Sequence, residues 1–288
     1  MKITDLRTTY HQQICKEIIR VKKDTKKDMD YPNFADCGNL SSVRIATGIT
    51  KRLNYLVSNA SISEQTAGGL FEKITSEFLE NSFNLLQHLR PGKWHYATTQ
   101  TEISRFIQYE HLAYLQEIIK QDKSLSAALG GDYIVKPDIV VARYPVADKE
   151  LNKKGQIVSS NDAVATLTPF RQTNNKNNNL ILHASISCKW TIRSDRSQNT
   201  RTEALNLIRN RKGHLPHIVA VTAEPLPTRI ATLALGTGDI DCVYHFALPE
   251  LKATIEEMKN QDLLEPLLSM IEGKRLRDIS DLPFDLAI

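Results

Sequence analysis

The sequence is poor in the features that mark several special classes of protein. It has only four cysteines in 288 residues, no Cys-x-x-Cys pair, and no cysteine–histidine group with the spacing of a zinc site. It has no apolar run long enough to cross a membrane and no recognisable signal peptide. The net charge is only +4, which permits a nucleic-acid partner without requiring one. We therefore expect a cytoplasmic protein with free thiols and no membrane partner.

Length and composition are those of an ordinary globular chain. Hydrophobic residues make up 41% and charged residues 24%, and a chain of this length can bury a sizeable core. No internal repeat and no linker divides it. We expect one domain over residues 1–288, helical over roughly 1–130 and with a sheet-containing core over roughly 131–288.

The periodicity of apolar residues distinguishes these two parts. Helical spacing dominates the first part, whereas short β-branched runs alternate with helical segments in the second. This alternation favours an α/β fold, an α/β/α core with a central mixed β-sheet and additional N-terminal helices. Helices are expected at Leu6–Lys23, Val43–Val57, Gln65–Leu89, Ile103–Leu129, Thr200–Arg211, Pro227–Leu235 and Pro249–Met270, strands at Asp138–Arg143, Leu180–Trp190, His217–Ala223 and Asp241–Ala247, and a projecting polar loop at Gln172–Asn179.

Two adjacent predicted strands carry the residues that metal-dependent phosphodiester cleavage requires. Asp138 stands at the head of KPDIVV and Lys189 near the end of SISCKW. A carboxylate there is a natural ligand for Mg²⁺, which prefers oxygen ligands and activates water. Side chains alternate along a strand, so Ser187 and Lys189 share one face while Cys188 points into the core. Lys189 would orient the attacking water or stabilise the transition state; the plain alternatives are a capping acid and a lysine that protects an edge strand.

One expected residue is missing from this pattern. Nucleases of this kind commonly carry an acid two residues before the lysine, and Ser187 occupies that position. The predicted helix from Gln65 offers three acids in its place. Periodicity makes Glu72 and Glu77 nearly equal candidates, with Glu80 a third, and each could equally be a solvated helix residue.

The segment directly after Lys189 has the residue types that read G·C base pairs. Arg193 and Arg196 can each donate two hydrogen bonds to guanine, and Asp195 can accept from cytosine, with about 1–3 kcal/mol of discrimination for each good contact. Ser194 and Ser197 fit the start of the following helix as N-caps. The alternative interpretation is a surface ion network of little energetic value.

Other candidates are less specific. Arg229 follows two prolines and could reach a DNA groove or simply be exposed, and Gln65 could contact a minor groove or cap its helix. The lysines at 22, 23, 26 and 27 are diluted by aspartates and indicate a solvated helix end rather than a phosphate clamp. Together the residues indicate an enzyme that recognises a DNA sequence and cuts it. The alternatives are a nuclease of the same fold directed by DNA structure, and a non-catalytic DNA-binding protein on a nuclease scaffold.

Long segments of the chain carry a family resemblance. The chain resembles the NgoMIV-type type II restriction endonucleases, the branch of the PD-(D/E)XK nuclease family that recognises a CCGG core. The segments that carry the resemblance are QTAGGLFEKITSEF, LQHLRPG, KPDIVVAR, LHASISCKWTIRSDRSQN, LNLIRNRKGHLPHIVAVTAEP, LGTGDIDCVYHFAL and GKRLRDISDLPFDLA.

The resemblance implies an active site of defined composition. Glu72 would be the displaced acid, and Asp138 would bind two Mg²⁺ ions together with the Cys188 backbone carbonyl, while Glu72 would act through water. Ser187 and Lys189 would complete the site.

The resemblance also implies a mode of DNA recognition. Arg193, Asp195 and Arg196 would read the central CCGG, Arg229 the outer G·C pair and Gln65 the minor groove. The family carries a serine for the outer pair where this chain has Gly38, with Asp36 nearby.

The implied product and partners follow. The enzyme would cut GCCGGC after the first G and leave four-base 5′ overhangs. It would act on double-stranded DNA as a homotetramer, a dimer of dimers, in a bacterial cytoplasm, within a restriction-modification system that includes a cognate DNA methyltransferase.

Overall fold

The computed structural model of the protein describes residues 2–25, 28–98, 101–121, 124, 135–175, 177–236 and 238–288, and only the backbone of residues 194–197. A six-stranded sheet in the order β3-β4-β5-β6-β7-β8 forms its centre. The first three strands are antiparallel neighbours and the last four are parallel neighbours. The sheet is therefore mixed, as the sequence predicts. Its strands are β3 (Trp94–Ala97), β4 (Ile139–Arg143), β5 (Ile181–Lys189), β6 (His217–Thr222), β7 (Cys242–His245) and β8 (Leu276–Asp278).

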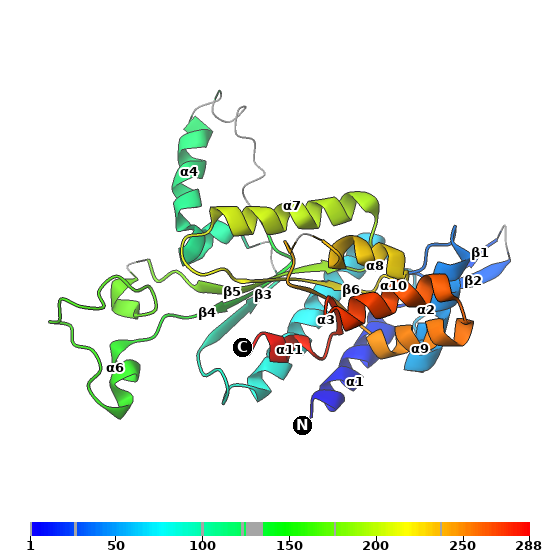
Figure 1. Ribbon diagram of the computed structural model, residues 1–288, viewed down its shortest axis with the longest axis horizontal. Coiled ribbons are helices and arrows are strands. Elements are labelled where there is room, and N and C mark those ends of the chain that lie inside the picture. The colour runs from blue at the N-terminus through cyan, green and yellow to red at the C-terminus, as the bar shows by residue number, and fades with distance from the viewer. Residues whose placement is uncertain are drawn as a thin grey trace.

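Helices cover both faces of this sheet (Figure 1). α7 (Ser194–Asn210) lies along one face and α3 (Glu64–Leu85) lies against the other. The layering is the α/β/α arrangement expected from the alternation of strands and helices. The remaining helices of four residues or more are α1 (Ile3–Gln13), α2 (Leu40–Leu53), α4 (Glu110–Gln121), α6 (Asp148–Leu151), α8 (Pro227–Ala234), α9 (Leu248–Met258), α10 (Gln261–Glu272) and α11 (Leu282–Asp285), besides a π-helical turn, Ile14–Ile18.

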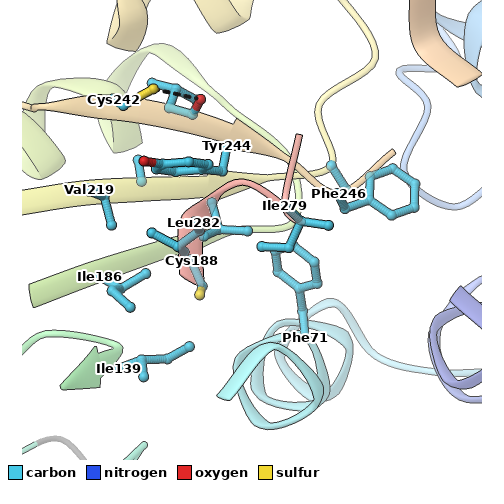
Figure 2. Close-up of a cluster of buried hydrophobic side chains, with 14 of the residues drawn as sticks. Phe71, Ile139, Ile186, Cys188, Val219, Cys242, Tyr244, Phe246, Ile279 and Leu282 are labelled. Carbon is cyan, nitrogen blue, oxygen red and sulfur yellow. Dashed lines mark hydrogen bonds between the residues drawn. The ribbon is translucent and has the colours of Figure 1, made fainter. Parts of the chain in front are cut away.

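The core between α3 and the sheet fixes the position of the third helix. Phe71 of α3 is fully buried, and its ring lies 5.2 Å from that of Trp190, one residue past the end of β5. Figure 2 shows Phe71 pointing toward Ile279 and the Cys188 side chain. Ile186 and Cys188 both face this core, which confirms the predicted alternation along β5. The packing sets α3 beside the strand end that carries Lys189.

The N-terminal part is less helical than the sequence indicates. The first predicted helix ends at the π-helical turn, and residues 21–23 of that prediction lie in a two-stranded hairpin of β1 (Val21–Asp24) and β2 (Met29–Pro32). Arg20 ends the helix because its guanidinium donates to the carbonyl oxygens of Lys16, Glu17 and Ile19. β3 also belongs to this part and forms one edge of the sheet. The expectation of a helical first 130 residues is wrong at these two places.

Three further predictions need correction. The helix expected at Ile103–Leu129 begins with two 3₁₀ turns and becomes α-helical at Glu110; residues 122–123 and 125–129 lie outside the described residues. The single helix expected at Pro249–Met270 is two helices, because Lys259 adopts a left-handed conformation between them. β8 was not predicted, since three residues carry too little pattern.

The connection from β4 to β5 projects from the body of the protein (Figure 1). α6 and the segment that follows it form this arm, which exposes the apolar side chains of Ile157, Val164 and Leu167. The polar segment Gln172–Asn179 lies at its return end. Arg171 and Asn175 are buried there, so part of this loop packs against the protein instead of projecting.

Two smaller findings bear on the cell-biological expectations. Within the described ranges, no helix combines the length and apolar character needed to cross a membrane. The four cysteines form no disulfide; Cys37 is exposed, and Cys15, Cys188 and Cys242 are buried.

Candidate functional site

Asp138 and Lys189 meet where β4 begins and β5 ends, in the interior of the central sheet. Lys189 Nζ lies 2.9 Å from Asp138 Oδ2. The same oxygen accepts the Cys188 backbone N–H at 2.7 Å and faces the Ser187 hydroxyl at 3.4 Å. The structure thus brings together the Asp138, Ser187, Cys188 and Lys189 positions that the sequence analysis proposed for one site.

The strand geometry explains this meeting. Asp138 directly precedes β4, whose last pair with β5 joins Ile139 to Ile186. β4 starts at Ile139, so on this side of β5 the Cys188 N–H donates to the Asp138 carboxylate and not to β4. On its other side Cys188 pairs with β6. Burial acts to lower the pKa of Lys189, but the charge and hydrogen bond of Asp138 outweigh it, and the pKa is raised above its ordinary value. Lys189 is therefore a cation at neutral pH.

Glu72 and Glu77 occupy different environments on α3. Glu72 lines the cavity that contains Asp138 and Lys189. Burial, together with the charge of Asp138, raises its pKa to about 7, although Lys189 acts to lower it. Glu77 forms a surface ion pair with Lys73 at 3.9 Å, and Glu80 is exposed. Of the three acids that the sequence left open, Glu72 is thus the one beside Asp138.

A further acid at this site escaped the sequence reasoning. Glu203, on α7, lines the same cavity. Burial raises its pKa; Asp138 acts in the same direction and Lys189 against it. In the sequence Glu203 stands among arginines and reads as a simple counter-charge. The sequence did contain one indication of this role. Glu203 lies about two turns after the start of the helix that follows Lys189, where a side chain can point back toward the strand end.

The cavity around these residues is large, about 920 Å³, and α3 leaves one wall of it bare. Gly68 and Gly69 line the cavity, and a Cβ built on either would meet no atom within 4 Å. Gln65 also lines it, at the start of the helix, where Ser63 provides the N-cap. A backbone surface without side chains allows a bulky ligand to approach the helix closely.

The arginine segment after β5 borders the same cavity. Arg193 lines it, its side chain is 61% exposed, and it makes a long contact of 3.4 Å with Glu64. Asp195 and Arg196 follow in the first turn of α7, and their side chains lie outside the description. Arg193 itself is the N-cap residue, without a side-chain cap, so the prediction of Ser194 and Ser197 as N-caps is wrong.

Arg229 reaches the cavity from the first turn of α8 rather than from a loop. It pairs with Asp36 and lies 3.9 Å from the buried Glu224. Glu224 also accepts the backbone N–H groups of Ile192 at 2.9 Å and Leu226 at 3.2 Å. This one carboxylate therefore holds together the two segments that carry Arg193 and Arg229. Asp36 additionally accepts the N–H of Gly38 at 2.9 Å.

The carboxylates suit a divalent cation held by few protein ligands. Within the described part of the chain, no three His, Cys, Asp or Glu side chains converge closely enough to enclose a metal. Asp138 nevertheless uses only Oδ2 in its contacts with described residues, which leaves Oδ1 free. Burial, more than the charge of Asp138, raises the pKa values of Glu72 and Glu203, and a cation bound beside them would favour their charged forms. Mg²⁺ typically binds one or two carboxylates together with waters and substrate phosphate.

Comparisons with known proteins indicate the family of this chain. The model of the NgoMIV restriction enzyme family matches residues 10–288. The type II restriction enzyme NgoMIV of Neisseria gonorrhoeae is 50% identical over 258 residues, which cover 88% of this chain and 89% of that protein.

Solved structures give weaker likenesses. The type IIF restriction endonuclease Bse634I with cognate DNA aligns over 87% of this chain and 99% of its own, with 11% identity and a TM-score of 0.37. The PspGI–substrate DNA complex aligns over 99% and 89%, with 13% identity and a TM-score of 0.26. Scores this low add nothing to an assignment, which therefore depends on the family model and the curated relative. On that basis the chain belongs to the NgoMIV restriction enzyme family and is a type II restriction endonuclease, a site-specific deoxyribonuclease.

Proposed function

We propose that the protein hydrolyses double-stranded DNA in a Mg²⁺-dependent reaction at a palindromic site with a CCGG core. The site is GCCGGC, cut after the first G to leave four-base 5′ overhangs. The observation that carries the proposal is the contact of Asp138 with Lys189, in a cavity that Arg193 and Arg229 also line. Residues proposed for cleavage and residues proposed for DNA recognition thus line the same cavity.

The active-site residues have separable roles in this proposal. Asp138 and the Cys188 backbone carbonyl would hold two Mg²⁺ ions, with Glu72 acting through water. When bound, Mg²⁺ supplies the positive charge that the pentavalent phosphorus needs and lowers the pKa of water. Lys189, held cationic by Asp138, orients the attacking water or stabilises the phosphorane oxygen.

Two further residues complete the chemistry. Ser187 positions Asp138 through its hydroxyl. Glu203 is a candidate proton carrier, since burial raises its pKa toward neutral pH. In-line attack by water on phosphorus expels the 3′ oxygen and leaves the phosphate on the 5′ end.

Recognition divides between the core and the outer base pairs. Arg193, Asp195 and Arg196 would read the central C·G pairs in the major groove. Arg229 would read the outer guanine, and Asp36, which already orients Arg229, replaces the side chain that Gly38 lacks. Gln65 at the start of α3 would contact the minor groove.

Two active sites related by twofold symmetry match the symmetry of a palindrome and can cut both of its strands in one binding event. The chain contributes one, so at least a dimer would act on each site. We propose the tetramer expected of the family, two dimers that each hold one site. The exposed apolar side chains of the arm between β4 and β5 support a contact between copies. A host that carries this enzyme also needs a methyltransferase that protects the same sequence.

The proposal is tested by mapping DNA ends. Purified protein is incubated with unmethylated phage DNA and Mg²⁺, and the cut ends are sequenced. Cuts within GCCGGC alone support the proposal. Cuts at CCGG with other flanks would remove the outer-pair assignment of Arg229, and random cuts would remove sequence recognition altogether.

A further inference from the structure

The β1–β2 hairpin stands at the rim of the active-site cavity. Lys22 of β1 and Tyr31 of β2 both line the cavity. They are direct cross-strand partners, so their side chains share one face of the hairpin. Lys23 and Asp30 are the next pair and point to the opposite face. Figure 1 shows the hairpin extending at one end of the molecule, beyond α2 and α8.

The two lysines differ in charge compensation. Lys23 pairs with Asp28 at 2.8 Å. Lys22 is exposed and forms no ion pair with any residue that the structure describes. Asp24 is the next residue on the Lys22 face, nearer the hairpin tip, and it does not line the cavity. An uncompensated ammonium group therefore borders the cavity, and only on this face.

The hairpin is held in place relative to the catalytic strand. Asn33, directly after β2, accepts the N–H of Arg20 at 3.1 Å and donates to the Ile18 carbonyl at 3.0 Å. The next residue, Phe34, is fully buried, and its ring lies 5.5 Å from that of Trp190. Trp190 follows Lys189 in the chain. Both ends of the hairpin are thus fixed against the strand end that carries the active site, which reduces the ordering cost of a contact made by Lys22.

We propose that this hairpin is a DNA-backbone contact in which Lys22, with Tyr31 beside it, binds a phosphate other than the scissile one. This inference rests on the proposed function, because it needs duplex DNA in the cavity. A phosphate contact adds affinity that is independent of sequence and sensitive to salt. Lys22, which the sequence indicated to belong to a solvated helix end, thereby acquires a role in substrate binding.

The test compares Lys22→Ala with Lys23→Ala, a matched control one residue away on the opposite face. Affinity is measured against salt concentration, without Mg²⁺, for a GCCGGC duplex and for an unrelated duplex of equal length. Cut positions are then mapped with Mg²⁺, and thermal unfolding checks that both variants fold. Ethylation interference locates the contacted phosphate.

Lys22→Ala should weaken binding by roughly fivefold at low salt on both duplexes, and should lower the slope of log K against log salt by about 0.9 for each bound protomer. Its cut positions should stay at the site, and one protected phosphate should be lost. Lys23→Ala should match the wild type. Equal behaviour of the two variants, or a loss restricted to the GCCGGC duplex with an unchanged salt slope, would overturn the inference while the wild type still cuts. A wild type that neither binds nor cuts DNA would overturn the proposed function itself.

Discussion

At the residue scale, the site depends on how one carboxylate is shared. Three donors approach Asp138 Oδ2, and one of them is the cationic Lys189. Glu72 and Glu203 face the same region without such partners, so burial and the Asp138 charge both raise their pKa values. Burial makes both carboxyl groups costly to ionise, so their charged forms destabilise the fold unless a cation lies beside them.

Glu72 should make stability depend on pH in a defined direction. Its pKa rises from 4.5 to about 7 on folding, so between these values the folded state binds more protons than the unfolded state. Without Mg²⁺, this contribution to stability is present below pH 4.5 and is lost as the pH rises to 7. Glu72→Gln should therefore raise Tm relative to the wild type at pH 8 and lose that advantage near pH 4.5.

Thermal unfolding across this pH range checks the prediction. Glu77→Gln is the control, because Glu77 pairs with Lys73 at the surface. Both variants keep the buried Glu224, so its own pH dependence cancels in the comparison. If the two variants show the same pH profile, Glu72 does not carry the charge described here.

At the element scale, α3 combines packing with an open face. Its buried side sets Phe71 against Trp190, while Gly68 and Gly69 leave the other side bare toward the cavity. Two adjacent glycines in a helix interior are unfavourable for folding. Their place beside the active site is explained if DNA must approach the helix backbone.

Gly69→Ala should stabilise the free protein and weaken its binding to DNA. The gain in stability should be up to about 1 kcal/mol, because alanine favours the helix and the new methyl group meets no atom. The loss of affinity should be several-fold, since the methyl group enters the cavity. Glu80→Ala, at an exposed position of the same helix, should leave affinity unchanged. Gly69→Ala with unchanged affinity would mean that DNA does not pass this face.

The elements differ in how well the sequence predicts them. β4 to β7 and α3 are long and strongly patterned, and they occur within a few residues of the predicted positions. β8 has three residues, and the break at Lys259 interrupts an apolar pattern that continues through both helices. The hairpin is missed because the hydrogen bond that joins its two ends, from the Arg20 N–H to the Asn33 side chain, links residues 13 positions apart, and periodicity does not detect such a contact.

The site shows the same limit. Asp138 and Lys189 are predictable because each stands at a strand end, where neighbouring strands meet. Periodicity alone could not separate Glu72 from Glu77, since the choice depends on how α3 rotates against the sheet. Glu203 was missed because its role depends on the direction in which α7 leaves β5. The rotation of α3 and the direction of α7 both depend on packing between elements. The choice of Glu72 over Glu77 could therefore come only from the family resemblance.

At the scale of the whole molecule, the cavity and the arm between β4 and β5 lie apart. The cavity lies at the edge of the sheet where β5 ends, and the arm between β4 and β5 leaves from the opposite end of that strand (Figure 1). We propose that residues 1–288 act as one domain, since α3 from the first part and β5 from the second share one core. Binding of DNA and contact between copies can then occur on separate faces.

Leu167→Glu should reduce assembly without altering the active site. Leu167 is 93% exposed on the arm, so its replacement leaves the packing within the chain intact. A charge at a buried contact between copies opposes association. Sedimentation of the variant should show a smaller species than the wild type, and Lys149→Glu on the same arm should not. Identical masses for Leu167→Glu and the wild type would exclude the arm as a contact.

Asp138→Ala tests the central claim most directly. Asp138 is the proposed cation ligand, and it contacts Lys189 at the end of β5, directly before the recognition residues. Single-turnover cleavage of a GCCGGC duplex is measured with Mg²⁺, and affinity for the same duplex is measured without it. The account predicts that cleavage slows by at least about 10³-fold, the scale of losing a charge-stabilising group, while affinity stays within a few-fold of wild type. Cleavage by Asp138→Ala at the wild-type rate would contradict the account.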